Sequence, residues 1–163
     1  MATKHVNVER FNVISTRPFQ DVVESVEAKI GHPDIIKFTQ AIAEAETMEE
    51  MHEIVHSAVG KSDLMEFMRL DIGQILRKDK NKRAPQSVRL IVGNPLIMKE
   101  MVQFVPDAAS YAPVTILIDE RSDGVHLSYD CTASFLESYG SAAALGAKEL
   151  DAKVETLLTE AAR

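Results

Sequence analysis

The spacing of hydrophobic residues changes along the chain, and each change predicts a different element. Residues 5–15 mix β-branched and polar side chains, which predicts a strand with a phase slip near Glu9–Phe11. After Pro18, apolar side chains recur every three or four residues and predict an amphipathic helix that ends at Gly31. The apolar stripe of this helix consists of Phe19, Val22, Val23, Val26 and Ile30.

Residues 32–60 carry two further helical patterns. Pro33 is suited to the first turn of the first helix. Thr47 and Glu50 have the form of a capping box, in which each side chain binds the backbone N–H of the other residue at a helix start. Gly60 ends the second pattern, so we expect a pair of helices over this range.

Short strands and helices alternate over the next forty or so residues. Residues 64–70 predict a strand, residues 71–78 a short helix and residues 87–92 a second strand. Gly93 breaks this strand, and Asn94 is placed to cap a helix that has Pro95 in its first position. The residues up to Pro106 are apolar on most sides, which predicts a largely buried helix.

The last part of the chain predicts a hairpin and a long helix. Residues 114–119 read as a strand that is apolar on both faces, and residues 121–124 read as a turn. In the returning strand, apolar residues alternate with His126, Ser128 and Asp130, so we expect this strand to be half exposed. Residues 141–162 predict a terminal helix whose buried stripe is Leu150, Val154, Leu157, Leu158 and Ala161.

These elements fit one α+β domain spanning residues 1–163, because 163 residues and 18.0 kDa are enough for one hydrophobic core. No run of eighteen apolar residues predicts a membrane span, and the first residues lack the apolar stretch of a signal peptide. Cys131 is the single cysteine, which excludes an internal disulfide and suits a reducing compartment. We therefore expect a cytoplasmic protein with no membrane partner.

The formal net charge of −7 argues against nucleic acid as a partner, since a polyanion is repelled by an acidic protein. One basic segment, Arg77 to Arg83, runs against this charge. It has no interleaved aromatic residues and contains Asn81, so we interpret it as a solvated loop rather than a nucleic-acid contact.

Several of these features together resemble the domain of unknown function 302 family. They are the Gly93-Asn94-Pro95 turn before a helix, Pro106 after it, the Ala112-Pro113-Val114 start of a strand, and the Asp123-Gly124 hairpin that leads to Ser128-Tyr129. The resemblance covers residues 64–130, and residues 32–60 look like a helical insertion. Members often carry an Asp-His pair after the strand that matches residues 64–70, whereas this chain has Asp71-Ile72.

The resemblance implies a TATA-binding-protein-like fold of β-α-β4-α type, with a curved antiparallel sheet packed with helices and closed by a terminal helix. It also implies a homodimer. It implies no activity, because the family is defined by a domain without an assigned one.

His52-Glu53-Ile54-Val55-His56 is the one segment whose spacing is typical of a metal site. Two imidazoles one helical turn apart can bind one zinc ion, and Glu53 is placed to activate a metal-bound water as the catalytic group. A third ligand would have to come from Glu49 or His126. The alternative interpretation is that His52 and His56 lie at the margin of the apolar helix face and bind no metal.

For ligand binding, the sequence offers Asn94 at a helix N-terminus, where backbone N–H groups can bind an anion, and Tyr129 at the end of the hairpin. Asn94 is also explained as a helix cap, and Cys131 beside Asp130 as a structural cysteine. Since no catalytic set is assembled, we expect a non-enzymatic homodimer without a cofactor that binds a small ligand or a protein partner. The alternative is a metal-binding protein or metal-dependent hydrolase that uses zinc at His52, Glu53 and His56.

Overall fold

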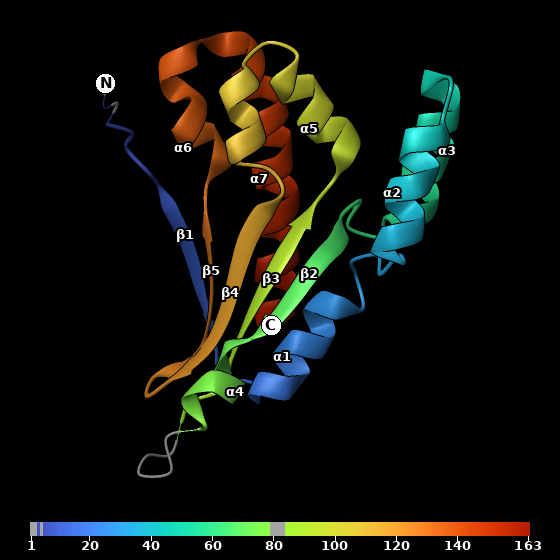
Figure 1. The fold of residues 1–163 in the computed structure, drawn as a ribbon. Coiled ribbons are helices and arrows are strands. Elements are labelled where there is room, and N and C mark those ends of the chain that lie inside the picture. The colour runs from blue at the N-terminus through green and yellow to red at the C-terminus, as the bar shows by residue number, and fades with distance from the viewer. Residues whose placement is uncertain (1–2, 4, 79–83) are drawn as a thin grey trace.

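The computed structural model of the protein describes residue 3, residues 5–78 and residues 84–163. Within these residues, five strands form one antiparallel sheet in the order β1-β5-β4-β3-β2 (Figure 1). The strands are β1 (Arg10–Ser15), β2 (Met65–Asp71), β3 (Ser87–Gly93), β4 (Val114–Arg121) and β5 (Gly124–Asp130). The predicted α+β class is confirmed.

Seven α-helices and two short 3-10 helices complete the described part of the chain. They are α1 (Phe19–Glu27), α2 (Ile35–Glu44), α3 (Met48–Ala58), α4 (Ile72–Leu76), α5 (Pro95–Val102), η1 (Pro106–Ser110), α6 (Thr132–Leu136), η2 (Glu137–Tyr139) and α7 (Ser141–Ala162). Helix α7 runs along one face of the sheet, where α1, α5 and α6 pack against it (Figure 1). None of the helices described combines the length and the apolar character that crossing a membrane requires.

The hydrophobic core lies between the sheet and these four helices. Both helical stripes predicted from the sequence are buried in it: the five apolar residues of the first helix, and the five of the last. Strands β3, β4 and β5 supply the opposite wall, with Leu90, Ile116 and Leu127 fully buried. The two stripes were predictable because helical spacing by itself places their residues on one side of each helix.

The predicted helix pair at residues 32–60 is present as α2 and α3, which project from the side of the sheet (Figure 1). The capping box forms as expected, since Glu50 N–H donates to Thr47 Oγ1 and the Glu50 side chain accepts from Thr47 N–H. At the start of α2 the cap is Asp34 rather than Pro33: its carboxylate accepts from Ile36 and Lys37 N–H. Helix α2 has no buried residue, whereas α3 buries Val55 and Ala58.

Two expectations about exposure were wrong. Strand β5 is not half exposed, since all residues from Val125 to Tyr129 are buried. It lies between β1 and β4, so neighbouring side chains shield both of its faces. The helix after Asn94 ends at Val102, and Phe104, which the apolar pattern placed in that buried helix, is 58% exposed.

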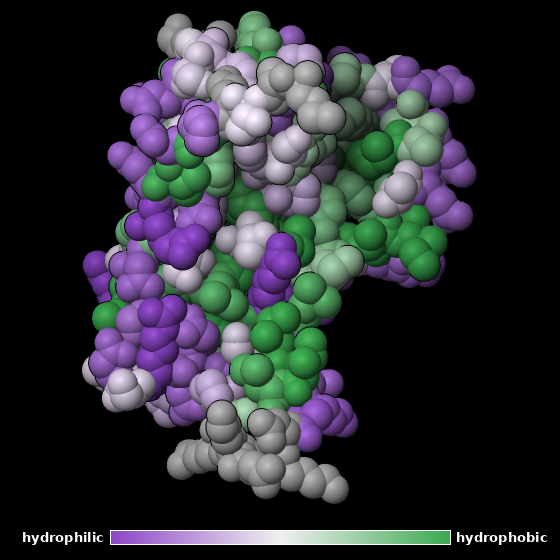
Figure 2. Space-filling view, turned by 60° about the vertical axis from the view of Figure 1, so that its left-hand side comes forward, coloured by the Kyte–Doolittle hydropathy of each residue, from purple (hydrophilic) through white to green (hydrophobic). Residues whose placement is uncertain are grey.

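The other face of the sheet is exposed to solvent on the edge strands β1 and β2 and buried along β5. The strand register places Met68 beside Ile91 and Leu70 beside Arg89 on this face, while Ile14 lies there beside His126. Ile14, Met68 and Leu70 are 47%, 53% and 38% exposed. Figure 2 shows apolar side chains gathered on this side of the molecule, among polar ones. We call this surface the open face of the sheet.

Candidate functional site

His52 and His56 lie one turn apart on α3, and both are exposed. Their ring centroids are 6.2 Å apart with an edge-to-face arrangement. In the described residues, no three His, Cys, Asp or Glu side chains are grouped so that they can hold a metal ion. Neither Glu49 nor His126 therefore completes a site in this chain, and metal binding by His52 and His56 stays a prediction.

His126 lies on the open face and is held by two oxygens. Its Nε2 is 2.9 Å from Asp123 Oδ1, and its Nδ1 is 3.3 Å from Asn12 Oδ1. The hydrogen bond from His126 lowers the pKa of the Asp123 carboxyl below its usual value. Both ring nitrogens are thus used within the hairpin and its neighbour β1, which explains how a histidine is buried there.

Asn94, a predicted ligand-binding residue, is buried and hydrogen-bonded through both polar atoms. Leu96 N–H donates to its Oδ1 at 2.9 Å, and its Nδ2 donates to the Asp63 carbonyl at 3.0 Å. The first bond confirms the predicted cap of α5, and the second ties the loop before β2 to it. Ligand binding by Asn94 stays a prediction, with its side chain already committed to these two bonds.

Tyr129, the other predicted ligand-binding residue, takes part in a buried network with Asp151. Its hydroxyl donates to Asp151 Oδ1 and lies 3.0 Å from Thr132 Oγ1. The same carboxylate accepts from the backbone N–H groups of Thr132 and Ala133 at 2.8 and 2.9 Å. Burial, and after it the Asp151 charge, raises the pKa of the Tyr129 hydroxyl. The network fastens α6 to α7 and leaves this hydroxyl fully engaged.

Cys131 lies next to this network and has the environment of a structural thiol. Burial raises its pKa, and the carboxylates of Asp151 and Glu155 raise it further. The thiol donates a weak hydrogen bond to Glu155 Oε1 at 3.9 Å. A raised pKa keeps the thiol protonated at neutral pH, which is the opposite of what a nucleophilic cysteine needs.

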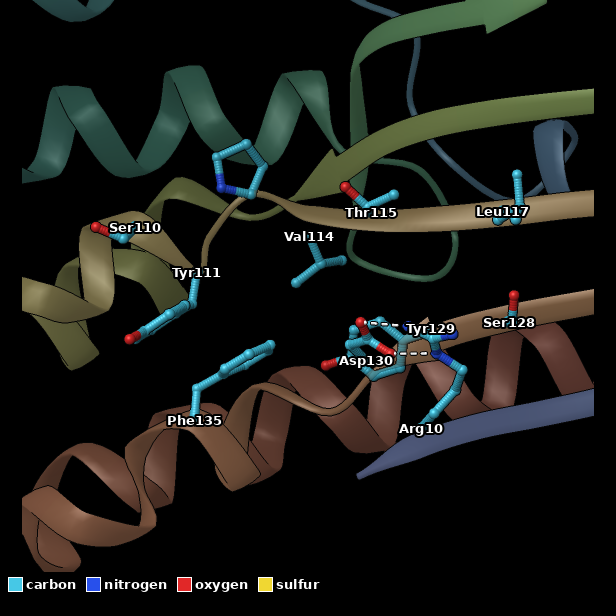
Figure 3. Close-up of a pocket in the computed structure, with 11 residues that line it drawn as sticks. Arg10, Ser110, Tyr111, Val114, Thr115, Leu117, Ser128, Tyr129, Asp130 and Phe135 are labelled. Carbon is cyan, nitrogen blue, oxygen red and sulfur yellow. Dashed lines mark hydrogen bonds and ion pairs between the residues drawn. The ribbon is translucent and has the colours of Figure 1, made fainter. Parts of the chain in front are cut away.

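A pocket of about 300 Å³ opens on the open face at the start of β4 and the end of β5 (Figure 3). We call it the Arg10 pocket. It is lined by Arg10, Ser110, Tyr111, Pro113, Val114, Thr115, Leu117, Ser128, Tyr129, Asp130 and Phe135. It thus brings together β1, β4 and β5, the segment after η1, and α6. Of the residues singled out in the sequence as ligand-binding, Tyr129 contributes to its wall and Asn94 does not.

Two fixed groups shape this pocket. Tyr111 and Phe135 stack in parallel, with ring centroids 4.6 Å apart and an angle of 6° between the rings. Across from them, Arg10 makes a two-point contact with Asp130, through Nε at 2.5 Å and Nη2 at 2.9 Å (Figure 3). The Arg10 side chain is 66% exposed, so this ion pair adds little stability and chiefly orients the guanidinium.

Polar groups surround the space between these two features. Arg89 Nη2 donates to Thr115 Oγ1 at 3.2 Å, which holds a second guanidinium at the edge of the pocket. Ser128 is only 9% exposed, yet its hydroxyl has no hydrogen-bond partner within the described residues. The hydroxyl of Ser110 likewise has no partner in the part of the chain that the structure describes.

No local sequence pattern connects Arg10, Ser128 and Phe135 as one site, because each lies in a different element. The polar alternation of β5 was the one available signal. This alternation predicts solvent exposure, whereas Ser128 and Asp130 line the pocket. The predicted basic loop, Arg77 to Arg83, lies partly outside the described residues, because residues 79–83 are not described. In its described part, Arg77 donates to Asp71 Oδ2 at 3.0 Å.

Comparison with known proteins gives a family and a fold. The model of a family described as "Domain of unknown function DUF302" matches residues 38–161. The matched range is wider than residues 64–130 and includes α3 and most of α2. No curated protein matches this sequence.

A crystal structure of an uncharacterized conserved DUF302 protein from Bacillus stearothermophilus superimposes with a TM-score of 0.63 at 10% sequence identity. The superposition covers 94% of this chain and 98% of that one, so the two share a fold over nearly their whole length. Because the family model matches most of the sequence, the chain belongs to the DUF302 family.

Proposed function

We propose that this protein is a cytoplasmic binding domain with a TATA-binding-protein-like fold, and that it holds a small ligand in the Arg10 pocket. The observation that carries the proposal is the Ser128 hydroxyl on the pocket floor, which has no protein partner among the described residues. Solvent reaches the Ser128 oxygen, so a ligand in the pocket can replace water as its hydrogen-bond partner. The stacked rings beside it supply an apolar wall, as is usual in ligand pockets.

The proposal is for binding rather than catalysis. The side chains with catalytic potential on β5 and directly after it are already engaged: both ring nitrogens of His126, the Tyr129 hydroxyl and the Cys131 thiol. A nucleophile needs a neighbouring base, and the raised pKa of Cys131 works against that role. A binding role needs only the pocket.

A fragment screen followed by protein-observed NMR tests this proposal. We expect at least one fragment to shift the backbone amides of Thr115, Leu117 and Ser128 together. Ser110→Phe places a ring at the exposed rim of the pocket and should weaken that fragment at least about tenfold. Ser122→Phe, an exposed position in the β4–β5 turn, is the matched control and should bind normally. Absence of any coordinated shift across a chemically mixed set refutes the proposal.

We further propose that the domain forms a homodimer through the apolar residues at the β2 side of the open face. Strand β2 is an edge strand, and its exposed Met68 and Leu70 lead into α4, where Ile75 and Leu76 are 69% and 44% exposed. Exposed apolar residues clustered along an edge strand favour pairing with a second chain.

Light scattering coupled to gel filtration checks the dimer. The wild type is expected to have twice the mass of one chain, and Met68→Lys combined with Leu70→Lys should give the mass of a single chain. Leu145→Lys is the matched control, since Leu145 is 72% exposed on α7, away from this strand. A monomeric wild type, or a double variant that stays dimeric, contradicts the proposed interface.

The alternative function is metal binding by His52 and His56, with Glu53 as the catalytic group of a hydrolase. It is favoured by the position of both imidazoles on the exposed side of α3 at a centroid distance of 6.2 Å. Elemental analysis should find one zinc per chain that is lost in His52→Ala with His56→Ala and kept in His32→Ala, which removes another exposed histidine. Protein purified without chelator that carries no zinc ends this alternative.

A further inference from the structure

We infer that the ligand of the Arg10 pocket is a small aromatic carboxylate, with one or two rings and a single anionic group. This inference rests on the proposed binding function and specifies its chemistry. Three features of the pocket carry it: its charge, its aromatic wall and its size.

The charges of the pocket lining balance, and an unpaired positive charge lies at its edge although the whole chain is acidic. The lining holds one guanidinium, that of Arg10, and one carboxylate, that of Asp130, which neutralises it. A second guanidinium, that of Arg89, lies just outside the lining, where it contacts the lining residue Thr115. Arg89 makes no ion pair in the described residues; its one contact there is the neutral hydroxyl of Thr115. With a formal net charge of −7, the chain has many acidic side chains that could have paired Arg89. An unneutralised arginine beside a pocket favours an anion.

Asp130 also limits which anion fits. Its carboxylate takes two N–H donors of Arg10 and leaves Nη1 without a bond in the described part of the chain. A group with several negative charges is repelled by Asp130, whereas a single carboxylate can bind Arg89 and the remaining donor of Arg10. The unpartnered hydroxyls of Ser128 and Ser110 then serve as further donors to its oxygens.

The aromatic wall selects the body of the ligand. Tyr111 and Phe135 come from two separate segments, yet their rings are parallel within 6°. Both side chains are half-buried, so the pair keeps an exposed surface toward the pocket (Figure 3). A flat ring extends such a stack and gains contact area on it, with an attraction that a saturated ring of the same size does not match.

The volume sets the upper limit. About 300 Å³ is at the small end of ligand pockets, which argues against a nucleotide or a peptide segment. One or two rings with a carboxylate fill this space, with the acid directed to the arginines and the ring to the aromatic wall.

Titration calorimetry and NMR with defined probes test the inference. Benzoate and 2-naphthoate are compared with their neutral amides, with cyclohexanecarboxylate and with inorganic phosphate. We expect the aromatic carboxylates to bind most tightly and to shift the amides of Thr115 and Ser128. Arg89→Gln should weaken them about tenfold, as should Phe135→Leu, because each removes one half of the recognition. Arg121→Gln is the matched control, since Arg121 is paired with Asp119 and does not line the pocket.

The outcomes separate this inference from the proposed function. If the amides bind as tightly as the acids, recognition of a carboxylate is wrong and the pocket binds neutral ligands. The same conclusion follows if the acids bind Arg89→Gln normally and bind Phe135→Leu more weakly. Phosphate that binds more tightly than 2-naphthoate overturns the aromatic component. If none of these probes binds but another fragment shifts the pocket amides, only the inference about the ligand is wrong. If no fragment binds at all, the proposed binding function is wrong as well.

Discussion

Asp151→Ala is expected to lower the free energy of unfolding by about 3 kcal/mol. The Asp151 carboxylate is buried and accepts three hydrogen bonds, from the Tyr129 hydroxyl and from the N–H groups of Thr132 and Ala133. Its removal takes the acceptor from Ala133 N–H, while Thr132 N–H keeps the Tyr129 hydroxyl and that hydroxyl keeps Thr132 Oγ1. A buried donor that loses its acceptor costs about 1 to 3 kcal/mol, and the loss of a charged acceptor weakens the other two bonds. Urea denaturation followed by circular dichroism measures the loss.

Two variants distinguish the network from burial in general. Tyr129→Phe removes one donor and keeps the carboxylate, so we expect a loss of about 1 kcal/mol. Glu155→Ala, one turn further along α7, removes a half-buried carboxylate whose contact with Cys131 is weak, and should change stability by less than about 0.5 kcal/mol. Equal losses in Asp151→Ala and Glu155→Ala would show that Asp151 does not fasten α6.

Gly31→Ala is expected to destabilise the protein by about 3 kcal/mol and to loosen the α2–α3 pair. A β-carbon at residue 31 would lie 1.8 Å from the Ala58 carbonyl oxygen, which belongs to the backbone and has no rotamer to change. Residue 31 also pairs with the start of β2, since its N–H donates to the Leu64 carbonyl and its carbonyl accepts from Glu66 N–H, both at 2.8 Å. Thermal unfolding and limited proteolysis within residues 35–58 measure the two effects.

Gly60→Ala should reproduce this result, because its β-carbon would lie 2.4 Å from the Lys29 carbonyl oxygen. Gly146→Ala is the contrasting variant: the nearest atom is in the side chain of Met101, which can move, and alanine favours the helix. We expect a change of less than about 1 kcal/mol there. If Gly31→Ala unfolds at the wild-type temperature and is cleaved at the wild-type rate, the backbone at residues 31 and 58 can move apart without cost.

The amino-acid sequence determined the local structure of this protein. The stripes of α1 and α7, the capping box of Thr47 and Glu50, and the Asn94 cap of α5 were all predictable, because each depends on residues within one or two helical turns. The family was also recognisable, because its turn and cap residues follow one another along the chain. Local signals of this kind survive in any tertiary environment that keeps the element.

The tertiary structure alone decided exposure and the candidate site. The alternation of β5 predicts an exposed polar side only if that strand has a bare face, and its position between β1 and β4 buried it instead. The Arg10 pocket depends on strand register: pairing of β1 with β5 sets Arg10 against Asp130, 120 residues later in the sequence. Tyr111 and Phe135 meet only because α6 folds back beside the segment after η1. No periodicity within one element encodes such contacts, since they arise when separate elements pack.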